Sequence, residues 1–139
     1  MPEGSERQAS SRDLAVAAAR AAADKQGERV AVLDVRELIV ITDYFVIASG
    51  ASDRQVRTII DEVERVLAAN GAKAIRREGQ SGGRWVLLDF VDLVVHVFVE
   101  EERDYYELER LWKDAPRIRW QPRAKTPKGD TTARPDKAG

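Results

Sequence analysis

Hydrophobic residues recur at helical spacing in three parts of the chain, and this pattern predicts three helices. The first begins at Ser10 or its neighbour, carries a face of alanines and ends at Gly27. The second begins at Ser52, where the side chains of Ser52 and Gln55 have the spacing of a capping box, and it carries a regular apolar stripe. The third covers about Glu102–Lys113, with leucine and aromatic residues along one face.

Shorter apolar runs predict five strands, at Val30–Val35, Tyr44–Ser49, Lys73–Arg77, Arg84–Asp89 and Leu93–Val99. The last of these is apolar on both faces and is expected in the centre of the sheet, paired as a hairpin with the strand before it. The expected fold class is therefore α/β in the α+β sense, a mixed β-sheet flanked by helices in the order α-β-β-α-β-β-β-α. We expect one domain over residues 10–120, preceded by a disordered arm at residues 1–9.

Composition narrows the class of protein. A chain of 139 residues is long enough for one domain with a single core. It has no cysteine, which excludes disulfides, thiolate nucleophiles and cysteine-bound zinc. No apolar run approaches the roughly 18 residues that indicate a membrane span, and the first residues lack the basic and apolar parts of a secretory signal. A cytoplasmic protein without a membrane segment is expected.

Charge is distributed unevenly along the chain. Residues 11–114 carry 15 Lys and Arg against 20 Asp and Glu, whereas residues 115–139 carry 7 against 2. We expect residues 121–139 to be a disordered basic tail. Such a tail can steer a protein towards RNA, or it can simply be solvated. No aromatic residue follows Trp120 on which a base could stack, which favours the second alternative.

A catalytic constellation is hard to assemble from these residues. His96, the only histidine, lies inside an apolar strand with no nucleophile or acid beside it in the sequence. Asp89 and Asp92 flank a turn, where short carboxylates usually bind backbone amides, and their spacing of three does not place them on one face of a strand. Asp34 and Asp43 lie far away in the chain. We expect no metal site.

The turn Ser49–Ser52 leads from a strand into a helix, a position that can hold a phosphate. It resembles the glycine-serine turn of nucleotidyltransferases, but the Asp-x-Asp pair that holds magnesium in those enzymes is missing. The simpler interpretation is a helix cap. No catalytic residue is expected here.

Aromatic residues are concentrated in one stretch, where Trp85, Tyr105, Tyr106 and Trp112 fall within 28 residues together with His96. Such a cluster either fills the core or forms a binding hot spot. Tyr105 and Trp112 are seven apart and would share one helix face, as core residues do. Tyr106 points about 100° away from Tyr105 and is the better candidate for an exposed contact.

The stretch Trp85–Trp112 resembles the signature of the ribosomal silencing factor family, also called Iojap-like. It has the family's Trp, apolar strand, Asp-x-x-Asp turn, Val-His-Val strand, acidic pair with Arg, and Tyr-x-Leu-Glu-x-Leu-Trp. The segments Leu33–Val35, Thr42–Ile47 and Ser52–Val56 agree as well, so the likeness covers about residues 12–113. One departure is Val91, where many members carry Gly.

The resemblance implies a nucleotidyltransferase-like fold without catalytic residues, hence a protein that is not an enzyme and needs no cofactor. It implies binding to L-fourteen, a protein of the large ribosomal subunit, so that joining with the small subunit is blocked and translation is repressed under nutrient limitation. A homodimer is expected when the protein is free, and the basic tail would at most contact ribosomal RNA incidentally. The alternative is a catalytically active nucleotidyltransferase that uses magnesium and a nucleoside triphosphate.

Carried over by matching positions, the resemblance also predicts the residues that meet or support the ribosomal protein. Glu101 and Arg103 are expected as polar contacts at the rim of this surface. The full predicted set is Trp85, Asp92, His96, Glu101, Arg103, Tyr106, Leu108 and Trp112.

Overall fold

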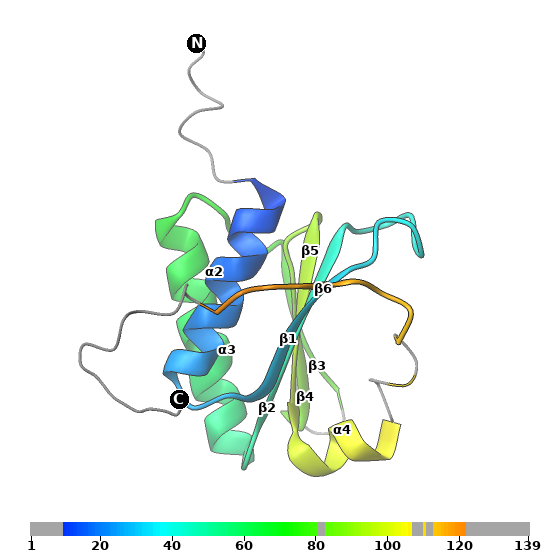
Figure 1. Ribbon diagram of the computed structural model, residues 1–139. Coiled ribbons are helices and arrows are strands. Elements are labelled where there is room, and N and C mark those ends of the chain that lie inside the picture. The colour runs from blue at the N-terminus through cyan, green and yellow to red at the C-terminus, as the bar shows by residue number, and fades with distance from the viewer. Residues whose placement is uncertain (1–9, 81–82, 107–109, 111–112, 122–139) are drawn as a thin grey trace, which may run out of the picture.

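The computed structural model describes residues 10–80, 83–106, 110 and 113–121, and the side chains within these ranges except those of residues 80 and 104–106. Its sheet has helices α2 and α3 on one face, while α4 and the β1–β2 connection lie towards the other (Figure 1). In chain order the elements are α2 (Ser11–Asp24), β1 (Glu28–Asp34), β2 (Tyr44–Gly50), α3 (Asp53–Ala69), β3 (Arg76–Gln80), β4 (Trp85–Asp89), β5 (Leu93–Val99), α4 (Glu100–Tyr106) and β6 (Arg117–Ile118).

The sheet is mixed, with strand order β3-β4-β5-β2-β1-β6. The pairing of β2 with β5 is parallel, and the other pairings are antiparallel. The predicted fold class is therefore confirmed, and β5 occupies the central position expected from its apolar residues. The helical connection through α3 is what allows β2 and β5 to run in the same direction.

The main core lies between the sheet and the helix pair α2 and α3. The helix α2 presents alanines that are buried, among them Ala15, Ala18 and Ala22, and their small side chains let the backbone of α2 approach its neighbours closely. The apolar stripe of α3 is buried in the same core through Val56, Ile59, Ile60, Val63 and Leu67. Both predicted helical faces thus have the partner that they require.

The cap of α3 differs from the predicted capping box by one residue. The Ser52 hydroxyl accepts a hydrogen bond from the Gln55 amide at 3.1 Å, as expected. The Gln55 side-chain oxygen, however, accepts from the amide of Ala51 at 2.7 Å instead of that of Ser52. Its NH₂ group donates to the carbonyls of Lys25 and Gln26, so the cap also ties the start of α3 to the end of α2.

Several boundaries depart from the sequence prediction. The third strand is Arg76–Gln80 and not Lys73–Arg77, because its residues pair in register with β4 as far as Trp85. The helix α4 begins at Glu100, immediately after β5. The strand β6 was not predicted; it consists of two residues and pairs with β1, just beyond a hydrogen bond from the Asp34 amide to the carbonyl of Pro116. The predicted arm at residues 1–9, and all but the first residue of the predicted tail, lie outside the described residues.

The turn between β4 and β5 contains a strained valine. Val91 has a φ of 76°, and the Asp92 amide donates to the carbonyl of Phe90 at 3.0 Å across it. This hydrogen bond and this φ belong to the γ-turn with positive φ, the rarer and more strained of the two forms. A β-branched side chain is poorly suited to positive φ. Val91 therefore stores conformational strain at a position where glycine would be relaxed.

The substitution Val91→Gly is expected to raise the free energy of unfolding by about 1 kcal/mol. Positive φ costs a residue with a side chain about 1–3 kcal/mol, and the greater freedom of glycine in the unfolded chain offsets only part of this gain. Urea denaturation measures the change. Val40→Gly is the matched control, because Val40 is also exposed but has no positive φ. Equal loss of stability in both variants would contradict the assignment of strain.

Candidate partner-binding surface

The face of the sheet that points away from α2 and α3 carries an aromatic and apolar surface. Cross-strand register aligns Trp85 with Phe98, Leu87 with His96 and Val94 with Phe45. These side chains share one face because residues alternate along each strand and their neighbours are buried under the helices. We call this surface the open face, and it consists of Phe45, Trp85, Leu87, Val94, His96 and Phe98. All except Phe98 are half-buried.

His96 lies in the middle of the open face and is surrounded by aromatic rings. The indole nitrogen of Trp85 donates to Nδ1 of His96 at 3.2 Å. Phe45 meets the imidazole edge to face, with ring centroids 5.0 Å apart, and Phe98 stacks on it at 6.0 Å. Because an indole only donates, Nδ1 must be the acceptor, and the neutral ring carries its proton on Nε2.

Burial lowers the pKa of His96 from 6.5 to about 4. The cause is the apolar surroundings, which disfavour the charged form of the imidazole. Protonation of Nδ1 would also remove the acceptor that Trp85 uses. At neutral pH His96 is therefore an uncharged member of an aromatic surface.

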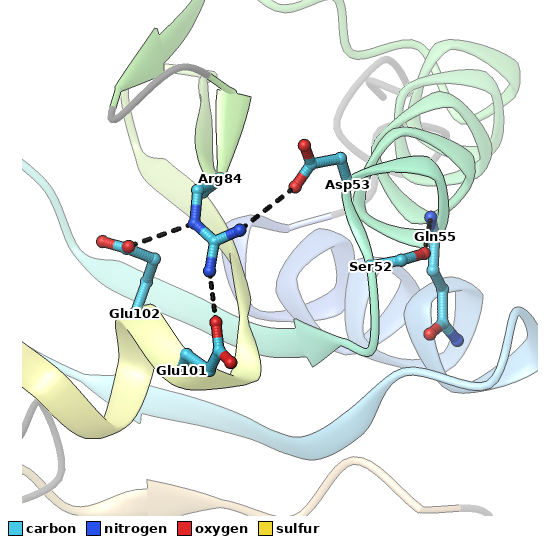
Figure 2. A network of polar contacts seen from close by, with 6 residues as sticks. All are labelled: Ser52, Asp53, Gln55, Arg84, Glu101 and Glu102. Carbon is cyan, nitrogen blue, oxygen red and sulfur yellow. Dashed lines mark hydrogen bonds and ion pairs between the residues drawn. The ribbon is translucent and has the colours of Figure 1, made fainter.

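The first turn of α4 places acidic groups beside one end of the open face. Arg84 binds two of them, Glu101 through Nη2 at 2.5 Å and Glu102 through Nε at 3.2 Å, and its Nη1 lies 3.8 Å from Asp53 of α3 (Figure 2). The Glu101 side chain is 81% exposed despite this contact. Glu101 is therefore accessible to a partner, and its role as a polar contact at the rim stays a prediction.

The position of Arg103 differs from the prediction. Its expected position was at the exposed rim, but its accessible surface is only 2%. Nη1 of Arg103 donates to the hydroxyl of Ser49 at 2.8 Å, and Ser49 is itself fully buried in β2. The prediction of an exposed Arg103 is wrong because α4 packs its arginine inward against the sheet. Arg103 instead fastens α4 to the central strands.

Of the other predicted residues, the structure describes only the side chain of Asp92. Asp92 is exposed at the opposite end of β5 from Glu101, and its carboxylate accepts from the Ser11 hydroxyl at 3.3 Å. Tyr106 ends the described part of α4, and nothing is described of its side chain; Leu108 and Trp112 lie outside the described residues.

Phe45 and Leu87 belong to the open face but were not predicted. Their alternation with buried neighbours was the available signal, but the sequence does not show which face the helices leave uncovered.

The aspartates considered for metal binding have separate partners. Arg36 binds both carboxylate oxygens of Asp34, at 2.9 and 2.7 Å, and this hydrogen bonding lowers the pKa of Asp34. Asp89 pairs with Arg76 at 2.8 Å and also accepts from the Val91 amide. Across the described ranges, no three His, Asp or Glu side chains are grouped as metal ligands would be.

Two of the backbone amides at the turn before α3 are already bound by side chains of the cap. The amides of Ala51 and Gln55, which could hold a phosphate, are bound by the side chains of Gln55 and Ser52. The neighbouring hollow of about 830 Å³ has arginines and carboxylates in equal number. Its acidic residues Asp53 and Glu101 face Arg84.

Within the described helices, none is long and apolar enough to cross a membrane.

Comparison with known proteins connects this architecture to a family. Residues 8–138 match the family model described as "Ribosomal silencing factor during starvation". The ribosomal silencing factor of Halalkalibacterium halodurans is 42% identical over 109 residues, which span 78% of this chain and 93% of that protein. The chain belongs to the ribosomal silencing factor family.

Structural similarity supports the same family. A crystal structure of a protein from Chromobacterium violaceum superposes with a TM-score of 0.71 and 33% identity, covering 76% of this chain and 88% of that one. A more distant relative is the mouse protein named "Mitochondrial assembly of ribosomal large subunit protein 1", which is 33% identical over 86 residues. The match covers 60% of this chain and 38% of the mouse protein.

The pKa of His96 predicts a specific pH dependence for the stability of this protein. Between pH 6.5 and about 4 the unfolded chain binds a proton at His96 that the folded chain does not. The free energy of unfolding therefore falls as the pH falls through this window, by at most about 1.4 kcal/mol per pH unit from this group. Urea denaturation at several pH values measures the slope.

In the variant His96→Phe this contribution is absent, so its stability should decline less than that of the wild type from pH 6.5 to 4. His96→Gln retains an acceptor for Trp85 without titrating, and it should show the same shallower slope. Parallel profiles for the wild type and both variants would rule out a depressed pKa for His96.

Proposed function

We propose that this protein binds L-fourteen, a protein of the large ribosomal subunit, through its open face and the first turn of α4. Binding would block joining with the small subunit and repress translation under nutrient limitation, in the cytoplasm. The description of the matching family and the name of the mouse relative support a ribosomal role. The structural observation that carries the proposal is the half-buried aromatic cluster around a neutral His96.

The chemistry of the open face suits a protein partner. Trp85, Phe45 and Leu87 offer apolar area that is partly hydrated in the free chain, and aromatic side chains contribute strongly to binding hot spots. An uncharged His96 adds little desolvation cost at neutral pH. The apolar surface could be covered by a partner of matching shape without burying an unpaired charge.

Charge complementarity supports a basic partner. Glu101 and Glu102 border the open face, and residues 11–114 have an excess of acidic residues. Opposite potentials raise the encounter rate and orient the two proteins. A partner's lysine or arginine could share Glu101 with Arg84, since that carboxylate is largely exposed.

The proposed mechanism is occlusion and needs no reaction. A standard protein interface buries about 800 Å² on each partner, so the contact would extend from the half-buried open face over the first turn of α4 and beyond. The rest of the domain would then stand where the small subunit approaches. We also propose that the open face pairs two free copies as a homodimer, since an apolar surface of this kind favours self-association. Asp92, Tyr106, Leu108 and Trp112 stay predicted contacts.

The substitution Trp85→Ala tests the proposal. It removes an aromatic ring and the hydrogen bond to His96, and it should weaken binding to purified large ribosomal subunits at least tenfold, about 1.4 kcal/mol. Co-sedimentation measures the affinity, and sucrose gradients show whether the wild type prevents the two subunits from joining. Ile75→Ser is the control, an exposed apolar residue that lies before β3 and not on the open face.

Leu87→Ser is a second variant on the open face and does not affect the indole contact. Circular dichroism establishes that each variant is folded. Normal joining of subunits at saturating wild-type protein would refute the proposed function. Unchanged affinity of both folded variants would remove the open face from it.

A further inference from the structure

The exposed large hydrophobic residues in the described part of the chain gather at one end of the sheet. Val40 is 98% exposed and Ile41 is 84% exposed, and Leu38 is exposed beside them. All three belong to the connection between β1 and β2. Ile75 and Val91 precede β3 and β5 at the same end, on other strands. We call Leu38, Val40 and Ile41 the apolar tip.

The apolar tip belongs to a hydrogen-bonded turn. The amides of Leu38 and Ile39 donate to the carbonyl of Val35 at 3.0 and 2.9 Å, and the Val35 amide donates to the carbonyl of Asp43 at 3.0 Å. Ile39 packs against the smaller core cluster, which includes Val35. Ile39 therefore anchors the turn to the core. The side chains of the apolar tip, beside Ile39, remain exposed to water, and nothing in the described fold explains their exposure.

The position of the apolar tip relates it to the open face. Ile39 and Phe45 both pack against the same core cluster, so the turn and the open face share one support. Figure 1 shows the β1–β2 connection on the side of the sheet opposite α2 and α3, which is also the side of the open face. A standard interface that covers Phe45 is large enough to include the apolar tip as well.

A small acidic hollow beside Leu38 indicates what kind of partner fits. It has a volume of about 210 Å³ and is lined by Asp34, Glu37, Asp114 and Pro116 together with Leu38. Asp34 is bound by Arg36, but Glu37 and Asp114 form no ion pair with another described residue. An apolar surface next to available carboxylates matches a protein segment that presents an apolar side chain beside a lysine or arginine.

We infer that the apolar tip is a second part of the ribosome-docking surface, and that it receives an apolar side chain flanked by a basic one from a protein of the large subunit. This inference rests on the proposed function. The carboxylates of the hollow would repel anionic lipid. A second copy of this chain would place its own acidic hollow against this one, and the like charges would repel each other. A basic protein segment satisfies both the apolar tip and the hollow.

The double variant Val40→Ser/Ile41→Ser tests the inference in the full chain. Both side chains are exposed, so their removal leaves the core intact. We expect at least a tenfold loss of affinity for purified large ribosomal subunits in co-sedimentation. Ile75→Ser, at the same end of the sheet but next to β3, should bind as the wild type does.

A second variant examines the acidic hollow. Glu37→Gln/Asp114→Asn should weaken binding about threefold at low salt and make the affinity less dependent on salt, because two screened charge interactions are lost. Arg65→Gln serves as its control, since it removes a charge that pairs within α3 with Glu62.

The outcomes separate this inference from the proposed function. If Trp85→Ala loses affinity but the tip variant binds as the wild type, the apolar tip is not part of the docking surface and the proposed function stands. If the wild type itself does not bind subunits, both fail. If the tip variant changes only self-association in sedimentation equilibrium, or only binding to phosphatidylglycerol vesicles, the inference is overturned in favour of a second copy or a membrane.

Discussion

The parallel pairing of β2 with β5 forms the centre of the sheet and sets the positions of the neighbouring strands and of α3. Seven residues of each strand align, from Tyr44 with Leu93 to Gly50 with Val99. Parallel strands require a crossover, and α3 lies in that crossover with its apolar stripe against the sheet. Once both strands are placed, β4 and β1 add at either side as antiparallel neighbours. The pairing thus decides which side chains of β5 face the helices and which remain for the open face.

The open face depends on this alternation along β5. Val95 and Val97 are fully buried in the helix-side core, so His96 must point to the other face. The register places Leu87 of β4 opposite His96 and Trp85 of β4 opposite Phe98. The histidine therefore becomes part of an aromatic group. Its depressed pKa follows from that placement. The chemical character of the surface is therefore a consequence of strand register more than of any single residue.

Two arginines hold α4 beside this surface in different ways. Arg103 is buried and bonds to Ser49 in the central strand β2, which fixes the helix against the sheet. Arg84 lies near the surface and joins the start of β4 to the first turn of α4 and to Asp53 of α3. A buried charged group requires close geometric matching, whereas exposed pairs exchange readily with solvent or with a partner. The helix is thus anchored firmly while its acidic edge stays accessible.

Most of the secondary structure was predictable because local signals were strong. The Ser10 and Ser52 caps, the alanine face of α2 and the apolar stripe of α3 were all found where expected. The start of β3 was displaced, because Lys73–Arg77 has little apolar pattern and its pairing with β4 decides the boundary. The two-residue strand β6 has no local signal, since it exists only through pairing with β1. The aromatic stretch is visible in the sequence, whereas the burial of Arg103 depends on how α4 packs against the sheet.

The fold class, the central place of β5 and the family resemblance could be predicted from the sequence, because they depend on hydrophobic periodicity and on side chains in a fixed order. The folded chain was needed to show that Trp85, His96 and Phe45 meet on one face, that Arg103 is internal and that Val40 and Ile41 are exposed. The physical reason is that burial and contact depend on strand register and on which face the helices cover. Both are set by residues that lie far apart in the chain.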